Sequence, residues 1–383
     1  MMSVSSGAKL LFISSTPYSE YSGGGSGISH HCFRALQSLV PAEYCFVPLP
    51  PPVAAEALFS KTAKLLHLPR RYFAYSEKRL ARIAETAEEK IGRSSAELLF
   101  FAGFTPWCGI SPDRPYAAYN DIPFATYVEI YNRKKEFSPH DLRRIMDRER
   151  EFLDKAQCVF FRSRWGLEEA RKAYRLSGGN FIAVGRGGAA LAPDADVYAG
   201  RHLLLFIARE FLPKGGDLCC KIFVELRKRI PDLELAIVGD APPRELLEIP
   251  GITYHGFFDK AIPAEQRQLN QLLAEAMFLV HPTSKDTNPL VISEAGYFGC
   301  PTVSVRAFAI PELIDDGRDG LLLDTPVDCG AAAARMEFYF HNGDAYHELR
   351  RNARRRHLSQ CSWPRVAECM ISELSKNRTD DGE

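Results

Sequence analysis

Short apolar runs alternate with helical patterns along this chain of 383 residues, and the alternation starts twice. The first series begins with the run Lys9–Ser14, a glycine-rich loop and a helical pattern over Ile28–Leu39. A stretch rich in Ala, Asp, Pro and Gly, Ala189–Gly200, interrupts the pattern before a new apolar run at His202–Ile207. Strands that alternate with helices favour parallel sheets covered by helices. We therefore expect two Rossmann-like, doubly wound parallel-sheet α/β domains that face a central cleft.

The chain is long enough for two hydrophobic cores, since ordinary domains contain about 100–200 residues each. We place the first domain at residues 1–195, the second at 196–365, and a helix end followed by a disordered polar tail at 366–383. The other strands expected in the first domain are Tyr44–Pro48, Glu97–Phe101, Tyr116–Tyr119, Cys158–Phe161 and Phe181–Val184, with helices at Pro139–Ala156 and Trp165–Tyr174. The second domain is expected to continue with strands Leu233–Val238, Ile252–His255, Met277–Val280 and Thr302–Val305, and with helices Asp217–Ile230, Pro263–Ala276 and Pro289–Phe298.

The charges of the chain balance, with 48 lysines and arginines against 48 aspartates and glutamates. No overall field therefore attracts nucleic acid, and any bound anion must be held locally. The ten cysteines include neither a CxxC pair nor a Cys/His cluster with zinc spacing, which is typical of reduced thiols and indicates no metal site. Because an apolar run of about 18 residues and a signal-like N-terminus are both absent, we expect a cytoplasmic protein.

Three segments are basic. Lys61–Arg82 and Arg133–Arg150 suit either an anionic membrane surface or solvated helix faces, and the interleaved acidic residues favour the solvated faces. Arg350–Arg356 falls late in a helical stretch, where cations interact favourably with the negative end of the helix dipole. A nucleic-acid patch is the alternative there, and the balanced charge of the chain argues against it.

Two cations follow the first strand of the second domain. Arg209 and Lys214 lie in the loop after His202–Ile207, and Asp217 is placed to cap the next helix. Sheets of this class bind ligands at the carboxyl ends of their strands. An arginine grips an oxyanion with two hydrogen bonds and a lysine adds a point charge, so the pair suits a diphosphate. Two solvated surface cations are the alternative interpretation.

Two carboxylates flank a predicted helix start. Asn288 is a favoured N-cap and Pro289 a favoured first helical residue, so free N–H groups can bind an anion there. Asp286 precedes this start, and Glu294 lies about one and a half turns into the helix. Ionised carboxylates accept hydrogen bonds from hydroxyl groups, so the pair could straddle a bound molecule, with one carboxylate near a sugar and the other near a ribose. Taken alone, Glu294 is equally well explained as an acid on a helix surface.

A third motif is the loop Tyr21–Gly27, which contains Gly24 and Gly25. Glycines let backbone N–H groups approach a phosphate or a sugar ring. The loop matches neither the GxGxxG fingerprint nor the Walker A motif, and a mobile turn is the alternative interpretation.

Taken together, these motifs resemble glycosyltransferase family 4, whose members have the GT-B fold. The resemblance extends from Leu205 to Leu321. Besides Arg209, it rests on Lys214–Asp217, Ile237–Gly239, Tyr254–Phe257, Pro282–Pro301, Pro311–Glu312, Asp316–Gly317 and Gly320–Leu321. Asp286 and Glu294 occupy positions that resemble the two acidic positions of the family's Glu-x7-Glu signature. In the first domain, Gly23–Gly27 is similar to the family's glycine-rich loop, and Asp121 resembles the acidic or histidine residue that faces the cleft.

The resemblance implies transfer of a hexose, with retention of anomeric configuration, from a UDP- or GDP-linked donor to a glycan or glycolipid acceptor. Neither a metal ion nor another cofactor would be needed, because Arg209 and Lys214 would neutralise the departing diphosphate. Asp286 and Asp121 are the further catalytic candidates. The donor-binding candidates implied by the resemblance are Gly24, Gly25, Phe257, Phe258, Asn288, Pro289, Leu290, Val291 and Glu294.

Two other functions fit the same fold. Asp286 is one methylene shorter than the usual glutamate, and Pro289 removes an amide, which would suit a non-catalytic module that binds nucleotides or glycans. A nucleotide-sugar epimerase or hydrolase is the second alternative, although different acid and base residues would be expected. Family habit indicates a role in polysaccharide or glycolipid biosynthesis, as a monomer or weak homo-oligomer with at most peripheral contact at the inner face of the membrane.

Overall fold

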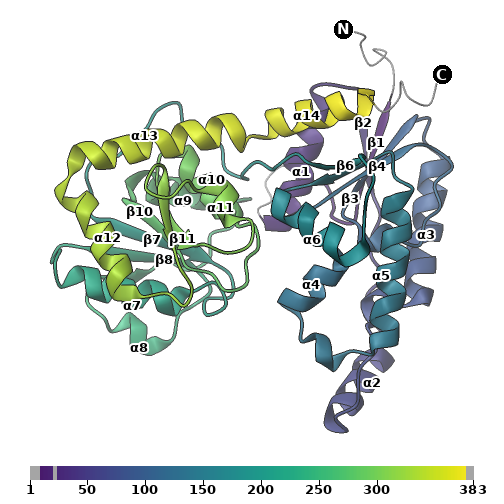
Figure 1. Cartoon of the computed structure of the whole chain (residues 1–383), viewed down its shortest axis with the longest axis horizontal. Helices are drawn as coiled ribbons and strands as arrows, with labels where there is room; N and C mark the ends of the chain where they lie inside the picture. The colour runs from purple at the N-terminus through teal and green to yellow at the C-terminus, as the bar shows by residue number, and fades with distance from the viewer. Residues whose placement is uncertain (1–8, 20–23, 377–383) are drawn as a thin grey trace. The chain divides into compact units, whose positions relative to one another are not determined.

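The computed structural model describes residues 9–19 and 24–376 (Figure 1). The chain forms two compact units: the N-terminal unit contains residues 9–19, 29–185 and 366–376, and the C-terminal unit contains residues 24–28 and 186–365. The division after residue 185 precedes the boundary expected after residue 195, because Ala190 is already buried in the core of the C-terminal unit. The described residues of the predicted C-terminal segment, 366–376, cluster with the N-terminal unit. The part of the expected tail at 377–383 lies outside the described residues.

The N-terminal unit contains a parallel sheet in the order β2-β1-β3-β4-β5-β6. Its strands are β1 Leu10–Ser14, β2 Ala42–Phe46, β3 Leu98–Ala102, β4 Tyr116–Asn120, β5 Cys158–Phe161 and β6 Phe181–Ala183. Its helices are α1 Gly24–Gln37, α2 Ala54–Leu65, α3 Glu77–Gly92, α4 Phe124–Tyr131, α5 Pro139–Asp154 and α6 Arg164–Tyr174, with short 3₁₀ turns η1 Phe73–Tyr75, η2 Thr105–Trp107 and η3 Lys134–Glu136. The strands confirm the sequence prediction, which did not identify α2, α3 or α4.

Apolar side chains cover both faces of this sheet. On one face, α3, α5 and α6 pack on Ile13, Phe101 and Val159. On the other face, Phe12 stacks on Phe100 with ring centroids 5.2 Å apart, and Phe33 of α1 lies beside them. Strands buried on both faces explain the continuous apolar runs of the sequence.

The C-terminal unit contains a second parallel sheet, in the order β12-β11-β10-β7-β8-β9. Its strands are β7 Leu203–Ala208, β8 Glu234–Gly239, β9 Ile252–Tyr254, β10 Phe278–His281, β11 Thr302–Val305 and β12 Gly320–Leu323. The helices that begin in this unit are α7 Gly216–Arg227, α8 Arg244–Leu247, α9 Pro263–Glu275, α10 Leu290–Tyr297, α11 Ile310–Leu313, α12 Cys329–His341, α13 Gly343–Gln360 and α14 Trp363–Lys376. Two parallel, doubly wound sheets confirm the predicted fold class.

The strand order of the second sheet runs outward in both directions from β7 and β10. Helix α7 packs on one face, in the core that contains Phe206, whereas α9 and α10 pack on the other, in the core that contains Leu205. Helices that leave neighbouring strands toward opposite faces define a topological switch point, where open α/β sheets bind ligands. The fold therefore places the loops after β7 and β10 at the position expected for a site.

None of the helices within residues 9–19 and 24–376 is long and apolar enough to cross a lipid bilayer.

Two arginines of the 350–356 cluster bind buried groups, rather than acting at a helix end as expected from the sequence. Arg350 lies in the middle of α13, is 1% exposed and donates from Nε to Oδ2 of Asp196 at 2.8 Å. It also donates to the carbonyl oxygens of Ala276 and Phe298. Arg354 likewise donates to the carbonyl oxygens of Tyr297 and Pro193. These arginines satisfy buried backbone groups, because α13 packs across the loops of its own unit.

Replacing Arg350 with alanine should destabilise the protein strongly, because it removes the charged partner of Asp196 and the hydrogen bonds to two carbonyl oxygens. We expect a loss of about 3 kcal/mol in the free energy of unfolding, measured by chemical denaturation. The matched control is Arg355→Ala on the exposed side of the same helix, which should change stability by less than about 0.5 kcal/mol. Equal effects of the two substitutions would contradict the inference that the buried hydrogen bonds of Arg350 stabilise the fold.

A buried carboxyl group in α5 should make stability depend on pH. Glu149 is 0% exposed and accepts hydrogen bonds from Thr105, Tyr174 and the backbone N–H of Phe124. Burial raises the pKa of Glu149 above its ordinary 4.5, although these three hydrogen bonds act in the opposite direction. The folded state therefore holds the proton more tightly than the unfolded state, so this contribution to stability is complete below pH 4.5 and is lost as pH rises through the folded pKa.

Glu149→Gln should remove this dependence while keeping the shape of the side chain. Melting temperatures of both proteins, measured from acidic to neutral pH, should show the wild type losing more stability than the variant as pH rises. Parallel curves would mean that Glu149 does not titrate in this range.

Candidate functional site

Two loops at the switch point are joined by a close backbone contact. Gly215 has a φ of +85°, and a Cβ atom on it would lie 2.2 Å from the carbonyl oxygen of Pro282. Ser284 donates from its backbone N–H and from Oγ to the carbonyl oxygen of Pro213, at 3.1 and 3.0 Å. Only glycine fits at 215, because any side chain would separate the loop after β7 from the loop after β10. The loop that carries Arg209 and Lys214 and the loop that carries Asp286 therefore form one surface.

Lys214 and Asp286 meet on this surface. Nζ of Lys214 lies 2.8 Å from Oδ2 of Asp286, whose backbone N–H donates to Oγ1 of Thr283 at 2.9 Å. Nε2 of His281, the last residue of β10, lies 3.8 Å from the same carboxylate oxygen, which is beyond direct hydrogen-bonding distance. Burial of Asp286 acts to raise its pKa, but the polar and electrostatic influence of His281 and the Lys214 ammonium outweighs it and holds that pKa well below the ordinary value. Asp286 is therefore ionised at neutral pH and orients Lys214.

His281 was not among the residues expected from the sequence. Its side chain is 0% exposed, and neither ring nitrogen has a hydrogen-bond partner. Its ring lies parallel to that of Phe206, with centroids 6.2 Å apart. A histidine at the end of an apolar strand gives no sequence signal that separates a buried core residue from a site residue.

Arg209 directly follows β7, at the carboxyl end of the C-terminal sheet, and its side chain is exposed. Its guanidinium carbon lies 4.3 Å from the centre of the Phe257 ring, in the loop after β9. Glu210 adopts a φ of +61° and donates its backbone N–H to Oδ2 of Asp240, which fixes the turn after Arg209. Stacking on an aromatic ring occupies a face of the guanidinium and leaves its N–H groups directed outward in the plane. The geometry suits a cation that binds an anion while Phe257 fixes its position.

Glu294 points from α10 into a buried position and already has partners. It is 4% exposed, and its Oε1 accepts from Nζ of Lys260 at 2.6 Å and from the backbone N–H of Ala189 at 3.1 Å. Lys260 follows Phe258, which packs partly on the core beneath it. Lys260 was not predicted from the sequence, because a single lysine after a short strand has no distinguishing pattern. The structure adds it as a third cation at this end of the sheet.

The start of α10 differs from the prediction by one residue. Pro289, rather than Asn288, is the N-cap, and α10 begins at Leu290. Oδ1 of Asn288 instead accepts a hydrogen bond from Nε of Arg186 at 2.8 Å, and Nη1 of Arg186 donates to Oγ of Ser293 at 3.0 Å. Arg186 is 2% exposed and also donates to the carbonyl oxygen of Pro289. This buried arginine, which the sequence did not reveal as a site element, holds the first turn of the helix that carries Val291 and Glu294.

The remaining predicted residues belong to other parts of the chain. Gly24 and Gly25 are the first residues of α1, which starts before the expected Ile28, and the part of the predicted loop at 21–23 lies outside the described residues. Asp121 follows β4 in the N-terminal unit, where a Cβ on Gly166 would lie 2.2 Å from its carbonyl oxygen. The structure thus brings Lys214 together with Asp286 and Arg209 together with Phe257, while Asp121 is part of the other unit.

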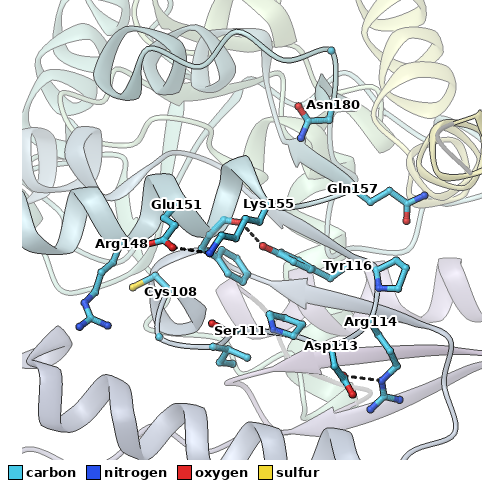
Figure 2. Close-up of a pocket in the computed structure, with 16 residues that line it drawn as sticks. Cys108, Ser111, Asp113, Arg114, Tyr116, Arg148, Glu151, Lys155, Gln157 and Asn180 are labelled. Atoms are coloured by element: carbon cyan, nitrogen blue, oxygen red, sulfur yellow. Dashed lines mark hydrogen bonds and ion pairs between the residues drawn. The ribbon is translucent and has the colours of Figure 1, made fainter. Parts of the chain in front are cut away.

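A hollow of about 1280 Å³ in the N-terminal unit lies at the end of the sheet where its strands begin (Figure 2). Tyr116, Gln157 and Asn180 line it from the amino ends of β4, β5 and β6. Lys155 of its wall is paired with Glu151 at 2.6 Å. Ligands of α/β sheets bind at the carboxyl ends of strands, so this hollow is not the candidate site.

Across the described ranges, no three histidine, cysteine, aspartate or glutamate side chains are grouped so that they could hold a metal ion.

Comparison with known proteins assigns the chain to a class of enzymes. A sequence model described as "Glycosyl transferases group 1" matches residues 201–342, which include Arg209, Lys214 and Asp286. The GDP-mannose-dependent alpha-(1-6)-phosphatidylinositol monomannoside mannosyltransferase of Mycolicibacterium smegmatis is 27% identical over 324 residues, 78% of this chain and 81% of that protein.

Solved structures with a similar fold cover nearly the whole chain. Sucrose-phosphate synthase from Thermosynechococcus elongatus superimposes with a TM-score of 0.70 at 16% identity, over 98% of this chain and all of that one. HepE from Anabaena, in complex with UDP-glucose, gives a TM-score of 0.60 at 16% identity, over 96% and 99% of the two chains. The two parallel Rossmann-like sheets, the match over residues 201–342 and these relatives identify the chain as a glycosyltransferase of the GT-B fold.

Proposed function

We propose that this protein transfers a hexose from a nucleoside diphosphate donor to a glycan or lipid-linked acceptor, with retention of anomeric configuration and without a metal ion. The observation that carries the proposal is the pairing of Lys214 with Asp286 at the switch point, on the surface to which Arg209 also belongs. A diphosphate bound here would receive hydrogen bonds from a forked guanidinium and a compact ammonium. These cations would stabilise the charge that develops on the leaving group, which is the task a divalent ion performs in other enzymes.

The low pKa of Asp286 limits its role. A carboxylate that stays ionised at neutral pH and is bound by Lys214 is a poor proton donor. We therefore assign Asp286 to positioning Lys214 and to accepting a hydrogen bond from the donor sugar. The acceptor's proton would pass to a phosphate oxygen of the donor as the acceptor attacks from the same face, so that no protein nucleophile is required. Asp121 remains a candidate for contact with the acceptor.

Glu294 and Lys260 would bind the nucleoside part of the donor. Glu294 is held in place by Lys260 and by the backbone of Ala189, and an ionised carboxylate is a good acceptor for ribose hydroxyls. Phe257 and Phe258 lie in the neighbouring loop, where the base would rest. The amides around Leu290 and Val291, at the start of α10, would contact the donor phosphates and sugar, and Gly24 and Gly25 at the start of α1 are further candidates.

The names of the relatives support a class of donor and acceptor. The mycobacterial relative is named as GDP-mannose-dependent and as acting on phosphatidylinositol monomannoside, whereas HepE is described with UDP-glucose. We infer a GDP- or UDP-linked hexose as donor and a glycolipid or growing glycan as acceptor, in the biosynthesis of a surface glycan. The enzyme would act in the cytoplasm, at the inner face of the membrane, as a monomer or weak homo-oligomer.

Removing either cation should slow transfer without preventing folding. With the GDP- or UDP-hexose that raises the melting temperature most, Arg209→Ala and Lys214→Ala should each lower kcat by about 100-fold or more. The matched control is Lys221→Ala, an exposed lysine on α7, which should retain the wild-type rate. Unchanged rates in both site variants would exclude the proposed leaving-group role, and donor binding by the wild type without any product would indicate a binding module instead.

Glu294→Gln should weaken donor binding rather than the chemical step. A hydrogen bond to a charged acceptor contributes about 1.5–3 kcal/mol, so the Kd of the nucleoside diphosphate, measured by calorimetry, should rise at least about tenfold. Glu225→Gln, an exposed glutamate on α7, serves as the control and should leave Kd unchanged. A melting curve checks that loss of the Lys260 pair has not unfolded the variant, and an unaltered Kd in a folded Glu294→Gln protein would refute the ribose contact.

A further inference from the structure

Large apolar side chains are exposed on α2 and the turn that follows it. Figure 1 shows this helix at the end of the N-terminal unit that lies away from the sheet, beyond α4 and α5. The side chains that are exposed by half or more are Val53, Leu58, Phe59, Leu65, Leu66 and Leu68. Single exposed leucines are ordinary, but six large apolar residues within one short segment mark a surface for interaction.

The helix is amphipathic with its apolar face outward. At about 100° per residue, Leu58, Phe59, Leu65 and Leu66 fall within an arc of roughly 120°. Ala63, about 100° around the helix from the centre of this arc, is buried at 6% exposure. Lys61 and Lys64 are exposed and lie about 40° and 100° beyond one edge of the apolar arc. The helix therefore presents leucine and phenylalanine with lysines beside them, which is the pattern of a helix that lies in a membrane interface.

Specific contacts hold this face outward. Glu56 of the inner side accepts from Nη1 of Arg79 at 3.0 Å and from the backbone N–H of Val53 at 3.3 Å. The ring of Phe59 contacts that of Phe73 edge to face, with centroids 5.7 Å apart. After the helix, the N–H of Leu68 donates to the carbonyl oxygen of Ala63 at 2.8 Å. The apolar face is thus anchored to its own unit from behind.

The surface is also basic. The sequence has no acidic residue between Glu56 and Glu77, while it has lysines and arginines at 61, 64, 70 and 71. Arg70 pairs with Glu136 at 2.5 Å, and its backbone bonds to Glu136 and Ser138. This contact brings the exposed side chains of Arg133, Lys134 and Lys135 alongside. Two basic segments that are remote in sequence, and that we interpreted separately as solvated faces, therefore form one surface.

We propose that α2 and its following turn dock on the surface of an anionic lipid bilayer. The helix, about 18 Å long, would lie in the interface with its leucines among the acyl chains and its cations among the headgroups. Charge complementarity favours lipid over a protein partner, because Lys61 and Lys64 lie exposed beside the apolar face in a stretch without acidic residues. Glu136 and Glu129 offset part of the neighbouring charge of Arg133 and Lys134. The proposal does not depend on the donor site, which belongs to the other unit, but it would bring a lipid-linked acceptor to the enzyme.

Vesicle flotation of the full chain tests this proposal. The wild type should float with vesicles of phosphatidylcholine mixed with phosphatidylglycerol, bind much less to phosphatidylcholine alone, and bind less at high salt. Lys61→Gln with Lys64→Gln should lower partitioning about 30-fold, since each cation near an anionic surface contributes roughly fivefold. Leu58→Ser with Leu65→Ser should lower it by more than about tenfold.

Leu191→Ser is the matched control, since this leucine is 75% exposed on the other unit and should leave partitioning unchanged. Thermal shifts with GDP and UDP should be the same in all these variants, which separates failure of docking from failure of the donor site. Absence of wild-type binding to anionic vesicles would overturn the proposal. It would also be overturned if both double variants bound as the wild type does, or if size-exclusion chromatography showed that the leucines join two copies of the chain instead.

Discussion

The candidate site is organised by the contact between two loops at the switch point of the C-terminal sheet. Gly215 lies against the backbone of Pro282, and Ser284 donates twice to Pro213, so the loop with the cations and the loop with the carboxylate behave as one piece. This contact fixes Lys214 against Asp286 before any ligand arrives. A preorganised charge pair needs little rearrangement when the diphosphate leaves, which is the condition under which electrostatic stabilisation is most effective.

The chain has no net charge, and the structure shows how it creates local positive charge nonetheless. Some arginines are buried and bound to backbone carbonyl groups, as Arg350 and Arg186 are, and these support the architecture. Others are exposed at places where their charge can reach a ligand or a surface. Arg209 is stacked on Phe257 at the switch point, and the cations near α2 lie beside an apolar face. The same residue type therefore has two roles, which its burial distinguishes.

Much of the fold and part of the site could be predicted before the structure. The alternation of apolar runs and helical patterns gave the parallel sheets, and Asp286 and Arg209 were found from their positions after strands. Lys260, Arg186 and His281 were missed, because each acts through a partner that is distant in sequence, such as Glu294 for Lys260. The N-cap of α10 shifted by one residue because Asn288 is bound by Arg186 instead of capping the helix.

The sequence by itself determined the class of fold and the residue types available at the ends of its strands, since periodicity and turn chemistry are local properties. Only the tertiary structure decided which of those residues meet. It joined Lys214 to Asp286, enclosed Arg350, and exposed the leucines of α2, although α3 and α5 of the same unit have their apolar sides buried. Burial and pairing depend on which segments fold against each other, and a one-dimensional pattern does not contain those distances.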